Sequence, residues 1–488
     1  MRRTIFFLMA LGFMISASAQ EMIRTRNCRP QIPTKHRQEV LRSQRRAPGE
    51  GENPYIGNRR QLVVMAAFKD QPFSDDETLT MYKWNKILND ENYNEAPYTG
   101  SFHDYFYEQS YGQFNITCDM HYVVADSMKK YRSTAIDDEN SKYLVQDVIE
   151  IIKSEVDDWA PYDWDGDGYV NQLLIIFSGL GQSDGGGSNT IWPHQWWLSE
   201  HEDCEPITVT SGGKDYLVDS YCCTSELAST SSSSTFGTLC HEFSHCLDLP
   251  DFYEGSTSYL NFWDLMDYGN QCGNGFRPCG YSAFERAQMG WLTPVELTHD
   301  TVITAMPALE DEPVAYMIRN EGHPDEYYLI ENRQKKGWDT ELHGSGIVVF
   351  HVDYDKNIFF EGYVNTSKLQ RYIIIPANDD ALPVYVWKKT AGWAYPYNGN
   401  DQLTNISSPA SKLNNTNKDG TLLMSKPIYD MAVTDSLASF RFGGVPSVIR
   451  PVRARESGVW YTIDGRSVQG EPAAGGLYIH DGKLELKR

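Results

Sequence analysis

The sequence lacks three features that would direct its interpretation elsewhere. Its nine cysteines include no C-x-x-C pair, which argues against a cysteine-based zinc knuckle. Basic residues are scarce: 43 Lys and Arg stand against 66 Asp and Glu, and the formal net charge of −23 argues against nucleic acid or an anionic membrane surface as a partner. Beyond the N-terminus no stretch reaches the roughly 18 apolar residues of a transmembrane helix, so no transmembrane segment is expected.

The N-terminus has the pattern of a secretory signal peptide. Arg2 and Arg3 precede an apolar run over residues 4–15, and the small residues Ala17, Ser18 and Ala19 form a cleavage site. We therefore expect a signal peptide over residues 1–19 and a mature protein that is secreted or at the cell surface. Export permits disulfides, and the odd cysteine count leaves at least one thiol without a partner in the chain.

The most informative motif is H-E-x-x-H at residues 241–245. On a helix, positions i and i+4 lie on one face about one turn apart, so His241 and His245 can bind one zinc ion from the same side. Glu242 can then take a proton from a water that the zinc activates. Two histidines and a glutamate are costly to bury on one helix without a ligand, so the motif predicts a zinc hydrolase.

A catalytic zinc site needs a third protein ligand and one open position. Asp251 falls on the last position of the metzincin pattern H-E-x-x-H-x-x-G-x-x-H, in which aspartate can replace the final histidine. Asp248 stands where the pattern has glycine, but aspartate tolerates the left-handed conformation that the turn requires. Two alternatives stay open: Asp251 could instead cap the turn at Pro250, and Glu285 on a later helix could be the ligand, as in gluzincins.

A methionine downstream of the ligands supports the metzincin interpretation. In that clan a methionine in a turn underlies the zinc site, and Met266 within residues 262–269 fits this role. A lone methionine is otherwise most often a core residue. Its place after the ligand run is what indicates a Met-turn.

The chain resembles the M6 family of metallopeptidases, the immune inhibitor A-like group. The resemblance implies a secreted zinc endopeptidase with a β-rich domain after the catalytic one. The tail at residues 461–466 and 476–483 resembles the C-terminal sorting domains of type IX secretion in Bacteroidota, the alternative being a generic terminal β unit. The blocks that carry the M6 resemblance are 61–64, 68–70, 100–106, 109–114, 163–170, 191–194, 237–253, 263–266, 283–291, 326–334 and 346–353.

The distribution of strand, helix and turn patterns along the chain predicts a multidomain protein. Basic, proline-containing residues 20–60 are expected to form a pro-segment or linker, and alternating strand and helix patterns over 61–295 predict an α/β or α+β metzincin-like catalytic domain. Short strands separated by turn residues predict a β-sandwich-like domain over 296–445 and a small C-terminal β unit over 446–488. Strands are expected at 61–68, 114–124, 173–177, 327–331, 346–352, 372–376 and 440–442, and helices at 75–89, 101–109 and 143–156.

A second metal site is suggested by Asp163, Asp165 and Asp167. Their alternate spacing, followed by Gly168, is that of the first half of an EF-hand calcium loop. The twelfth position would be Leu174 in place of the usual glutamate, so the loop is not a complete EF-hand. It is expected either to bind calcium with other ligands or to be an acidic, solvated turn.

Together these features predict a zinc-dependent endopeptidase that hydrolyses peptide bonds of extracellular proteins, with zinc as its cofactor and calcium as a second candidate ion. Its expected partners are protein or peptide substrates, and the oligomeric state stays open. The competing function is a catalytically degenerate surface adhesin or glycan-binding protein. Its binding face would be the aromatic-rich β module, with Trp387, Trp393, Tyr395 and Tyr397.

Overall fold

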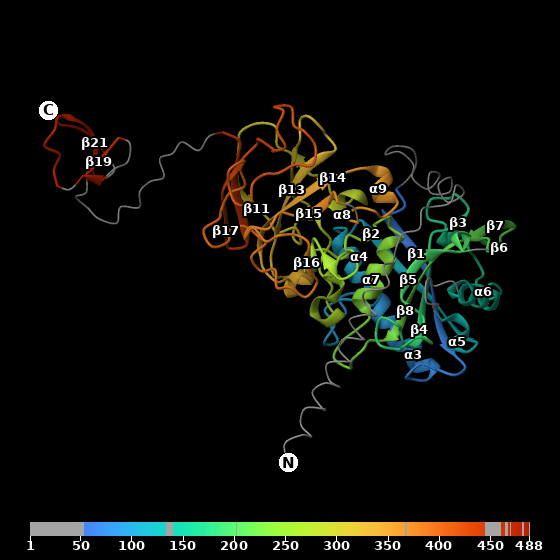
Figure 1. Ribbon diagram of the computed structural model, residues 1–488. Helices are drawn as coiled ribbons and strands as arrows, with labels where there is room; N and C mark the ends of the chain where they lie inside the picture. Colours follow the sequence, from blue (N-terminus) through green and yellow to red (C-terminus); the bar gives the residue numbers. More distant parts are fainter. Residues whose placement is uncertain are drawn as a thin grey trace, which may run out of the picture. The chain divides into compact units, whose positions relative to one another are not determined.

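The computed structural model describes residues 53–132, 140–201, 203–366, 368–444, 460–463, 467–468, 470–480 and 483–487. The expected signal peptide and residues 20–52 of the expected pro-segment lie outside these ranges. The described chain forms two compact units, one ending at Phe442 and one beginning at Gly443 (Figure 1). Among the described residues no helix has the length and apolar character needed to cross a membrane.

The helices of the first unit are short. The α-helices are α3 (Glu77–Asn89), α4 (Phe102–Gln109), α5 (Met128–Tyr131), α6 (Ser141–Ile152), α7 (Phe236–His245), α8 (Ala283–Gln288) and α9 (Lys356–Phe360). The 3-10 helices are η1 (Ala160–Tyr162), η2 (Leu198–Glu200), η3 (Asn261–Trp263), η4 (Gly269–Gly275) and η5 (Gly337–Glu341).

A five-stranded sheet forms the centre of the expected catalytic domain, which is called the catalytic part below. Its order is β2 (Phe114–Ala125), β1 (Gly57–Phe68), β4 (Leu173–Leu180), β8 (Ser220–Leu227) and β5 (His194–Trp197). The first four strands are parallel, and β5 is an antiparallel edge strand. A parallel sheet is normally covered on both faces, and this one is.

The alternation of side chains along β1 divides the core between those two faces. Val63 and Met65 pack in one cluster with residues of α4 and α7, while Leu62 and Val64 pack in a second cluster with residues of α6. Figure 1 accordingly shows α6 on the opposite side of the sheet from α4 and α7. The continuous apolar run at 61–68 therefore reflects a strand buried on both sides.

The folded unit begins earlier than the sequence suggests. We expected order from residue 61, but β1 begins at Gly57, and the segment before it is bound to the body of the unit. Asn53 Nδ2 donates to the Met289 carbonyl at 2.9 Å, and Trp291 Nε1 donates to the Tyr55 carbonyl at 2.7 Å. Residues 53–60 thus pack with the catalytic part, whereas the sequence placed them in the pro-segment or linker.

Two further sheets form the β-rich part. The larger runs β10 (Val295–Glu296), β12 (Tyr316–Arg319), β13 (Glu326–Arg333), β14 (Gly346–Asp353) and β15 (Tyr372–Ile374), and the smaller runs β11 (Thr301–Met306), β18 (Leu437–Phe442) and β17 (Ile428–Thr434). Tyr328 and Ile330 of β13 share a buried cluster with Phe440 of β18, so the two sheets enclose a common core. The sandwich-like interpretation of this part stays a prediction.

The larger sheet is also buried on its other face. Leu329 of β13 and Phe350 of β14 belong to the same buried cluster as Met65 of β1 and Phe243 of α7. The catalytic and β-rich parts therefore share one hydrophobic core across the expected boundary at residue 295, and the domain limits themselves stay a prediction.

The remaining strands form small sheets. Two lie in the first unit: β3 (Tyr169–Val170), β7 (Lys214–Val218) and β6 (Ile207–Ser211), and the pair β16 (Val384–Tyr385) and β9 (Thr257–Ser258). The second unit holds a four-stranded sheet of β20 (Ser467–Val468), β19 (Trp460–Thr462), β21 (Gly476–His480) and β22 (Lys483–Lys487).

Candidate active site

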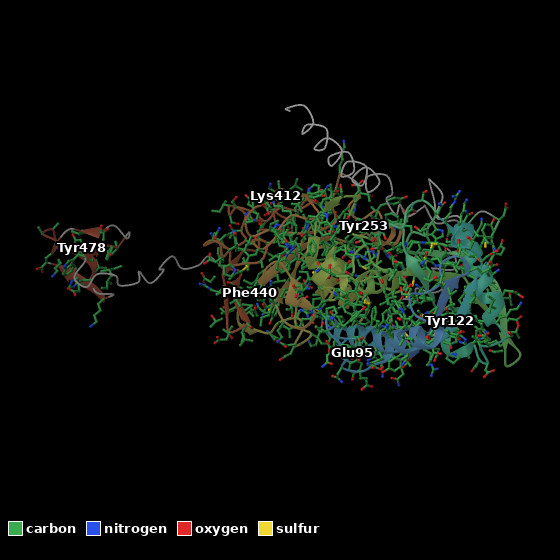
Figure 2. The ribbon with its side chains drawn as sticks, turned by 90° about the horizontal axis from the view of Figure 1, so that it is seen from below. Glu95, Tyr122, Tyr253, Lys412, Phe440 and Tyr478 are labelled. Carbon is green, nitrogen blue, oxygen red and sulfur yellow. The ribbon has the colours of Figure 1, made fainter. Side chains whose placement is uncertain are left out.

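The motif helix α7 lies deep in the first unit. Leu239 and Phe243 anchor it in the core beneath the five-stranded sheet. A Cβ at Gly237 would come within 1.9 Å of the Asn270 carbonyl oxygen, so glycine permits the close approach of η4 to this helix. In Figure 2, Tyr253, two residues beyond Asp251, lies between Tyr122 at one end of the unit and Phe440 at the other.

His241, His245 and Asp251 converge on one point. The Nε2 atoms of His241 and His245 lie 3.1 and 3.5 Å from Asp251 Oδ1. Both Nδ1 atoms face backbone carbonyls, that of Leu265 at 2.9 Å and that of Leu249 at 2.7 Å. A carbonyl only accepts hydrogen bonds, so each Nδ1 donates, and in the neutral form of each ring Nε2 has a lone pair directed at the shared point.

These three residues fit a metal ion such as zinc. Their candidate ligand atoms all lie within 4.8 Å of one another. Asp251 Oδ1 is a buried carboxylate oxygen without a hydrogen bond, which is costly unless a cation offsets it. Two imidazole nitrogens and one carboxylate oxygen are a donor set that zinc accepts, with room for a fourth ligand.

The charges of the three groups are strongly coupled. Although burial by itself lowers the pKa of His241, contact with the Asp251 carboxylate outweighs it and raises that pKa to about 9. Burial lowers the pKa of His245. The neighbouring imidazoles hold the pKa of Asp251 below its ordinary value, despite the opposing effect of burial. The site therefore favours an anionic Asp251 beside positive charge.

Glu242 lies at the edge of this cluster. Its Oε2 is 3.9 Å from His245 Nε2, and its side chain is 10% exposed. The carboxylate is thus close to the point on which the imidazoles converge without belonging to the group of three. This position suits a base that acts on a molecule held there.

The turn after the motif helix has the expected conformation. Asp248, at the position where the metzincin pattern has glycine, has φ of 67°, in the left-handed region. Its Oδ2 accepts a hydrogen bond from the Tyr55 hydroxyl at 3.0 Å. The turn reverses the chain after His245, so Asp251 returns to the two histidines.

Met266 lies where its backbone supports the site. Its side chain is fully buried in the same cluster as α7. The Leu265 carbonyl orients His241, and the Met266 carbonyl accepts the N–H of Phe252, next to Asp251, at 2.9 Å. Residues 265 and 266 therefore contact the chain on both sides of Asp248: His241 before it, and Phe252, next to Asp251, after it.

Asp267 is a supporting residue that the sequence analysis missed. Its Oδ2 accepts hydrogen bonds from Ser258 Oγ at 2.8 Å and from the backbone N–H groups of residues 259–261 at 2.9–3.2 Å. Burial raises the pKa of this carboxyl to about 7 against the effect of those bonds. The residue fixes the loop that leads into the Met-turn, and no local pattern in the sequence signals it.

Glu285, the rival ligand, has a different role. Its Oε2 accepts bonds from the N–H and the hydroxyl of Ser282 at 2.7 and 3.0 Å, so it caps its own helix α8. It is fully buried, and burial raises its pKa to about 7. It does not belong to the group of candidate metal ligands around His241.

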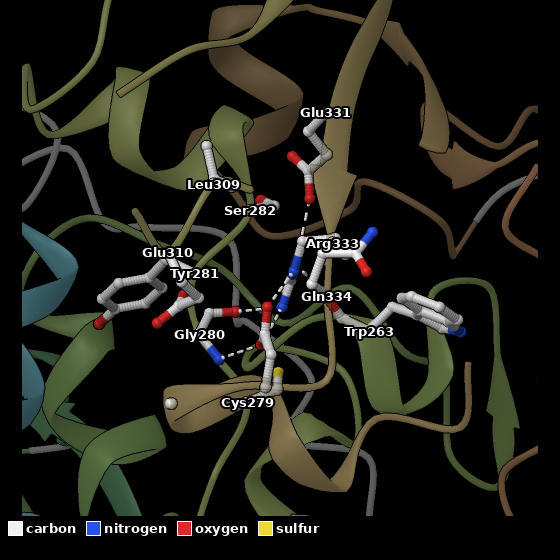
Figure 3. A network of polar contacts seen from close by, with 12 residues as sticks. Trp263, Cys279, Gly280, Tyr281, Ser282, Leu309, Glu310, Glu331, Arg333 and Gln334 are labelled. Carbon is white, nitrogen blue, oxygen red and sulfur yellow. Dashed lines mark hydrogen bonds and ion pairs between the residues drawn. The ribbon is translucent and has the colours of Figure 1, made fainter. Parts of the chain in front are cut away.

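A buried network joins Arg333 of the β-rich part to the segment that contains Trp263 (Figure 3). Arg333 of β13 donates from Nε and Nη2 to the two Asp339 oxygens, at 2.6 Å each, and from Nη1 to Glu331 at 3.1 Å. The same guanidinium also donates to the carbonyls of Trp263 at 3.1 Å and Gly280 at 2.9 Å. It therefore holds the chain three residues before Met266.

The three aspartates of the acidic loop also come together. Candidate ligand oxygens of Asp163, Asp165 and Asp167 lie within 4.8 Å of one another. Asp163 Oδ1 is buried without a hydrogen bond, while its Oδ2 accepts the Gly168 N–H at 3.1 Å and lies 3.3 Å from Lys214 Nζ. The loop thus places a buried Asp163 oxygen that lacks a hydrogen bond close to the Lys214 cation.

Comparisons with known proteins agree with this geometry. Residues 61–292 match the family model described as immune inhibitor A peptidase M6, catalytic domain. The chain is 25% identical over 308 residues to immune inhibitor A of Bacillus thuringiensis subsp. alesti, an alignment that covers 51% of this chain and 43% of the relative.

A second relative is the pre-pro-metalloprotease PrtV of Vibrio cholerae serotype O1 (strain M66-2). It is 23% identical over 180 residues, which cover 30% of this chain and 18% of the relative. The chain therefore spans less than half the length of the curated relatives it matches. The matched segment contains all the residues that converge around His241, and over this segment the chain is similar to the M6 family of peptidases.

Proposed function

We propose that the protein is a zinc-dependent endopeptidase that hydrolyses peptide bonds of extracellular proteins. The observation that carries this proposal is the convergence of His241, His245 and Asp251 on one point with Glu242 beside it. Similarity to the M6 peptidase family model over residues 61–292 supports the same reaction class, and one of the two relatives is named a metalloprotease.

In this mechanism each residue has a defined task. His241, His245 and Asp251 would hold the zinc ion, which when bound supplies Lewis-acid activation of a water and of the scissile carbonyl. Glu242 accepts the proton of the attacking water as the new C–O bond forms. It then donates that proton to the amine as the C–N bond breaks, so the proton balance closes.

The test is a conservative change at Glu242. Glu242→Gln keeps the size of the side chain and removes its basicity, so kcat/KM for a casein-derived peptide should fall by about 10²–10⁴-fold. Bound zinc, measured by mass spectrometry, should stay near one per chain. The control is Glu91→Gln, which changes an exposed residue far from Glu242 in the sequence, and this variant should cleave like the parent.

Three outcomes separate the possibilities. Undiminished cleavage by Glu242→Gln would refute the role of Glu242. Parent protein that cleaves no peptide, with or without added zinc, would favour a degenerate binding protein. Loss of cleavage on treatment with a chelator, reversed by zinc, supports the proposal.

We further propose that the protein is exported through its signal peptide at residues 1–19, with the C-terminal β unit as a sorting domain. The support is the tripartite N-terminal pattern and the separate compact unit from Gly443. Removal of residues 443–488 should leave the protein inside the producing cells, as judged by immunoblots of cells and medium. Full export of the truncated chain would contradict the role of the tail.

The acidic loop is proposed to bind calcium through Asp163, Asp165 and Asp167. The support is the buried Asp163 oxygen that lacks a hydrogen bond, in a loop whose carboxylate spacing suits a hard cation. Calcium at 100 times its Kd should stabilise the protein by about 2.7 kcal/mol. Asp165→Asn should remove most of that stabilisation in a thermal shift assay, and an unchanged calcium response would refute the site.

A further inference from the structure

A row of aromatic rings leads from the metal-ligand cluster to the surface. The ring of Tyr253 lies 6.3 Å from that of His241, Tyr268 lies 5.3 Å from Tyr253, and Trp387 lies 6.4 Å from Tyr268, all between ring centroids. Each step is within the range of direct aromatic contact. The row therefore joins the candidate ligand His241 to Trp387 through successive ring contacts.

The outer end of the row is exposed but fixed. Trp387 is 55% exposed, and its ring also packs 5.9 Å from that of Phe262. The preceding residue, Val386, is held on both sides: its N–H donates to the Ser256 carbonyl at 3.3 Å, and its carbonyl accepts from Asn261 Nδ2 at 2.7 Å. A tryptophan so fixed loses little conformational entropy when a ligand covers it.

The rings of the row come from different parts of the chain. Tyr253 and Tyr268 belong to the catalytic segment, whereas Trp387 follows β16 of the β-rich part. The pairing of β16 with β9 brings them together, with Tyr385 opposite Thr257. The β-rich part thus supplies a ring to the surface next to the catalytic site.

We propose that Trp387 is a substrate-binding residue that receives an aromatic or large apolar side chain of a peptide substrate. This inference rests on the proposed endopeptidase function, because the occupant is the peptide being cleaved. The row is continuous with His241, so a peptide bound across the metal site and extended along the row reaches Trp387. At about 3.3 Å per residue, the contacting side chain lies within about five positions of the scissile bond.

The experiment compares peptides that differ by one side chain. The peptides are ten residues long and are compared in pairs. The two members of a pair differ at one position around the scissile bond, where one has Phe and the other has Ala, and kcat/KM is measured for each peptide. The parent should prefer Phe at one remote position, and Trp387→Ala should reduce that Phe-to-Ala ratio about tenfold, the effect of losing one buried aromatic contact. Trp387→Phe should restore part of the preference.

Tyr385→Ala is the matched control. Tyr385 is 54% exposed on the same strand pair but, among the described residues, makes no ring contact with the row. It should keep the parent's preference at every position. An unchanged preference in Trp387→Ala, with cleavage intact, would overturn the inference and leave the proposed function standing.

A binding measurement separates the inference from the proposed function. In a Glu242→Gln background the peptides are bound without being cleaved, and their Kd is measured by calorimetry. The preferred Phe peptide should bind about tenfold more weakly when Trp387→Ala is added. If the parent cleaves nothing but this difference persists, the endopeptidase proposal fails while Trp387 remains a peptide-binding residue; equal Kd values overturn the inference.

Discussion

Replacement of Arg333 by methionine should destabilise the protein more than any surface ion-pair change. The guanidinium is fully buried, and all its hydrogen-bonding directions are used on Asp339, Glu331 and two backbone carbonyls. Methionine fills part of the volume but leaves two buried carboxylates without their cation. Breaking a buried pair in this way costs about 3–5 kcal/mol.

The assay is urea unfolding followed by circular dichroism, with Arg441→Met as the matched control. Arg441 of β18 pairs with Asp430 at 3.3 Å, and its side chain is 38% exposed, so its loss should cost less than about 1 kcal/mol. The two changes remove the same group from buried and exposed settings. Equal losses of stability would refute the reasoning.

A second change tests whether the cost comes from the stranded charge. Asp339→Asn in the Arg333→Met background neutralises one carboxylate and keeps an oxygen that can accept the Gly280 N–H, which Asp339 Oδ1 accepts at 2.9 Å. The double variant should therefore be more stable than Arg333→Met alone. A double variant as unstable as the sum of both single changes would show that lost packing, and not unpaired charge, carries the effect.

Three further predictions concern the site. Asp251→Ala should weaken zinc binding by on the order of 100-fold or more in a chelator competition, whereas Glu285→Gln should change zinc binding little. A large effect of Glu285→Gln with a small effect of Asp251→Ala would make Glu285 the ligand. Asp248→Ala should lower stability by about 1–2 kcal/mol relative to Asp248→Gly, because only glycine adopts a φ of 67° without strain; equal stabilities in thermal unfolding would contradict this. Burial raises the pKa of Glu285 to about 7, so the native state binds a proton that the unfolded chain releases above pH 4.5, and stability is lost as the pH rises towards 7. Glu285→Gln should remove about 1.4 kcal/mol of that loss per pH unit, measured by urea unfolding at pH 5 and 7, and parallel pH profiles would refute it.

The sequence predicted those elements whose burial can be recognised from the order of apolar and polar residues within one short segment. The apolar run at 61–68 and the periodic helix at 75–89 correspond to β1 and α3, and their ends differ from the prediction by only a few residues. The strand β8 was missed although it lies inside the sheet. Its Ser220, Thr224 and Ser225 are buried polar residues, and a run of hydroxyls does not look like a core strand until its partners are known.

The same limit applies to the candidate site. His241, Glu242 and His245 follow from one helical turn, and Asp251 follows from a pattern of fixed spacing. Arg333 could not be predicted, because two of its acceptors, the Trp263 and Gly280 carbonyls, lie 70 and 53 residues away on segments that the sequence does not mark as neighbours. Residues that orient a site act through tertiary contacts, and a single sequence does not record those contacts.

The candidate site is therefore local in its proposed ligands and non-local in the contacts that support it. All three candidate ligands lie within residues 241–251, but the turn that orients His241 is held by Arg333 from β13, beyond the end of the family-model match at residue 292. The β-rich part also completes the core behind α7 and supplies Trp387 to the row of rings. Because the β-rich part contacts the segment before Met266 and also carries Trp387, changes in it should alter metal binding and substrate preference separately: Arg333→Met the first, and Trp387→Ala the second.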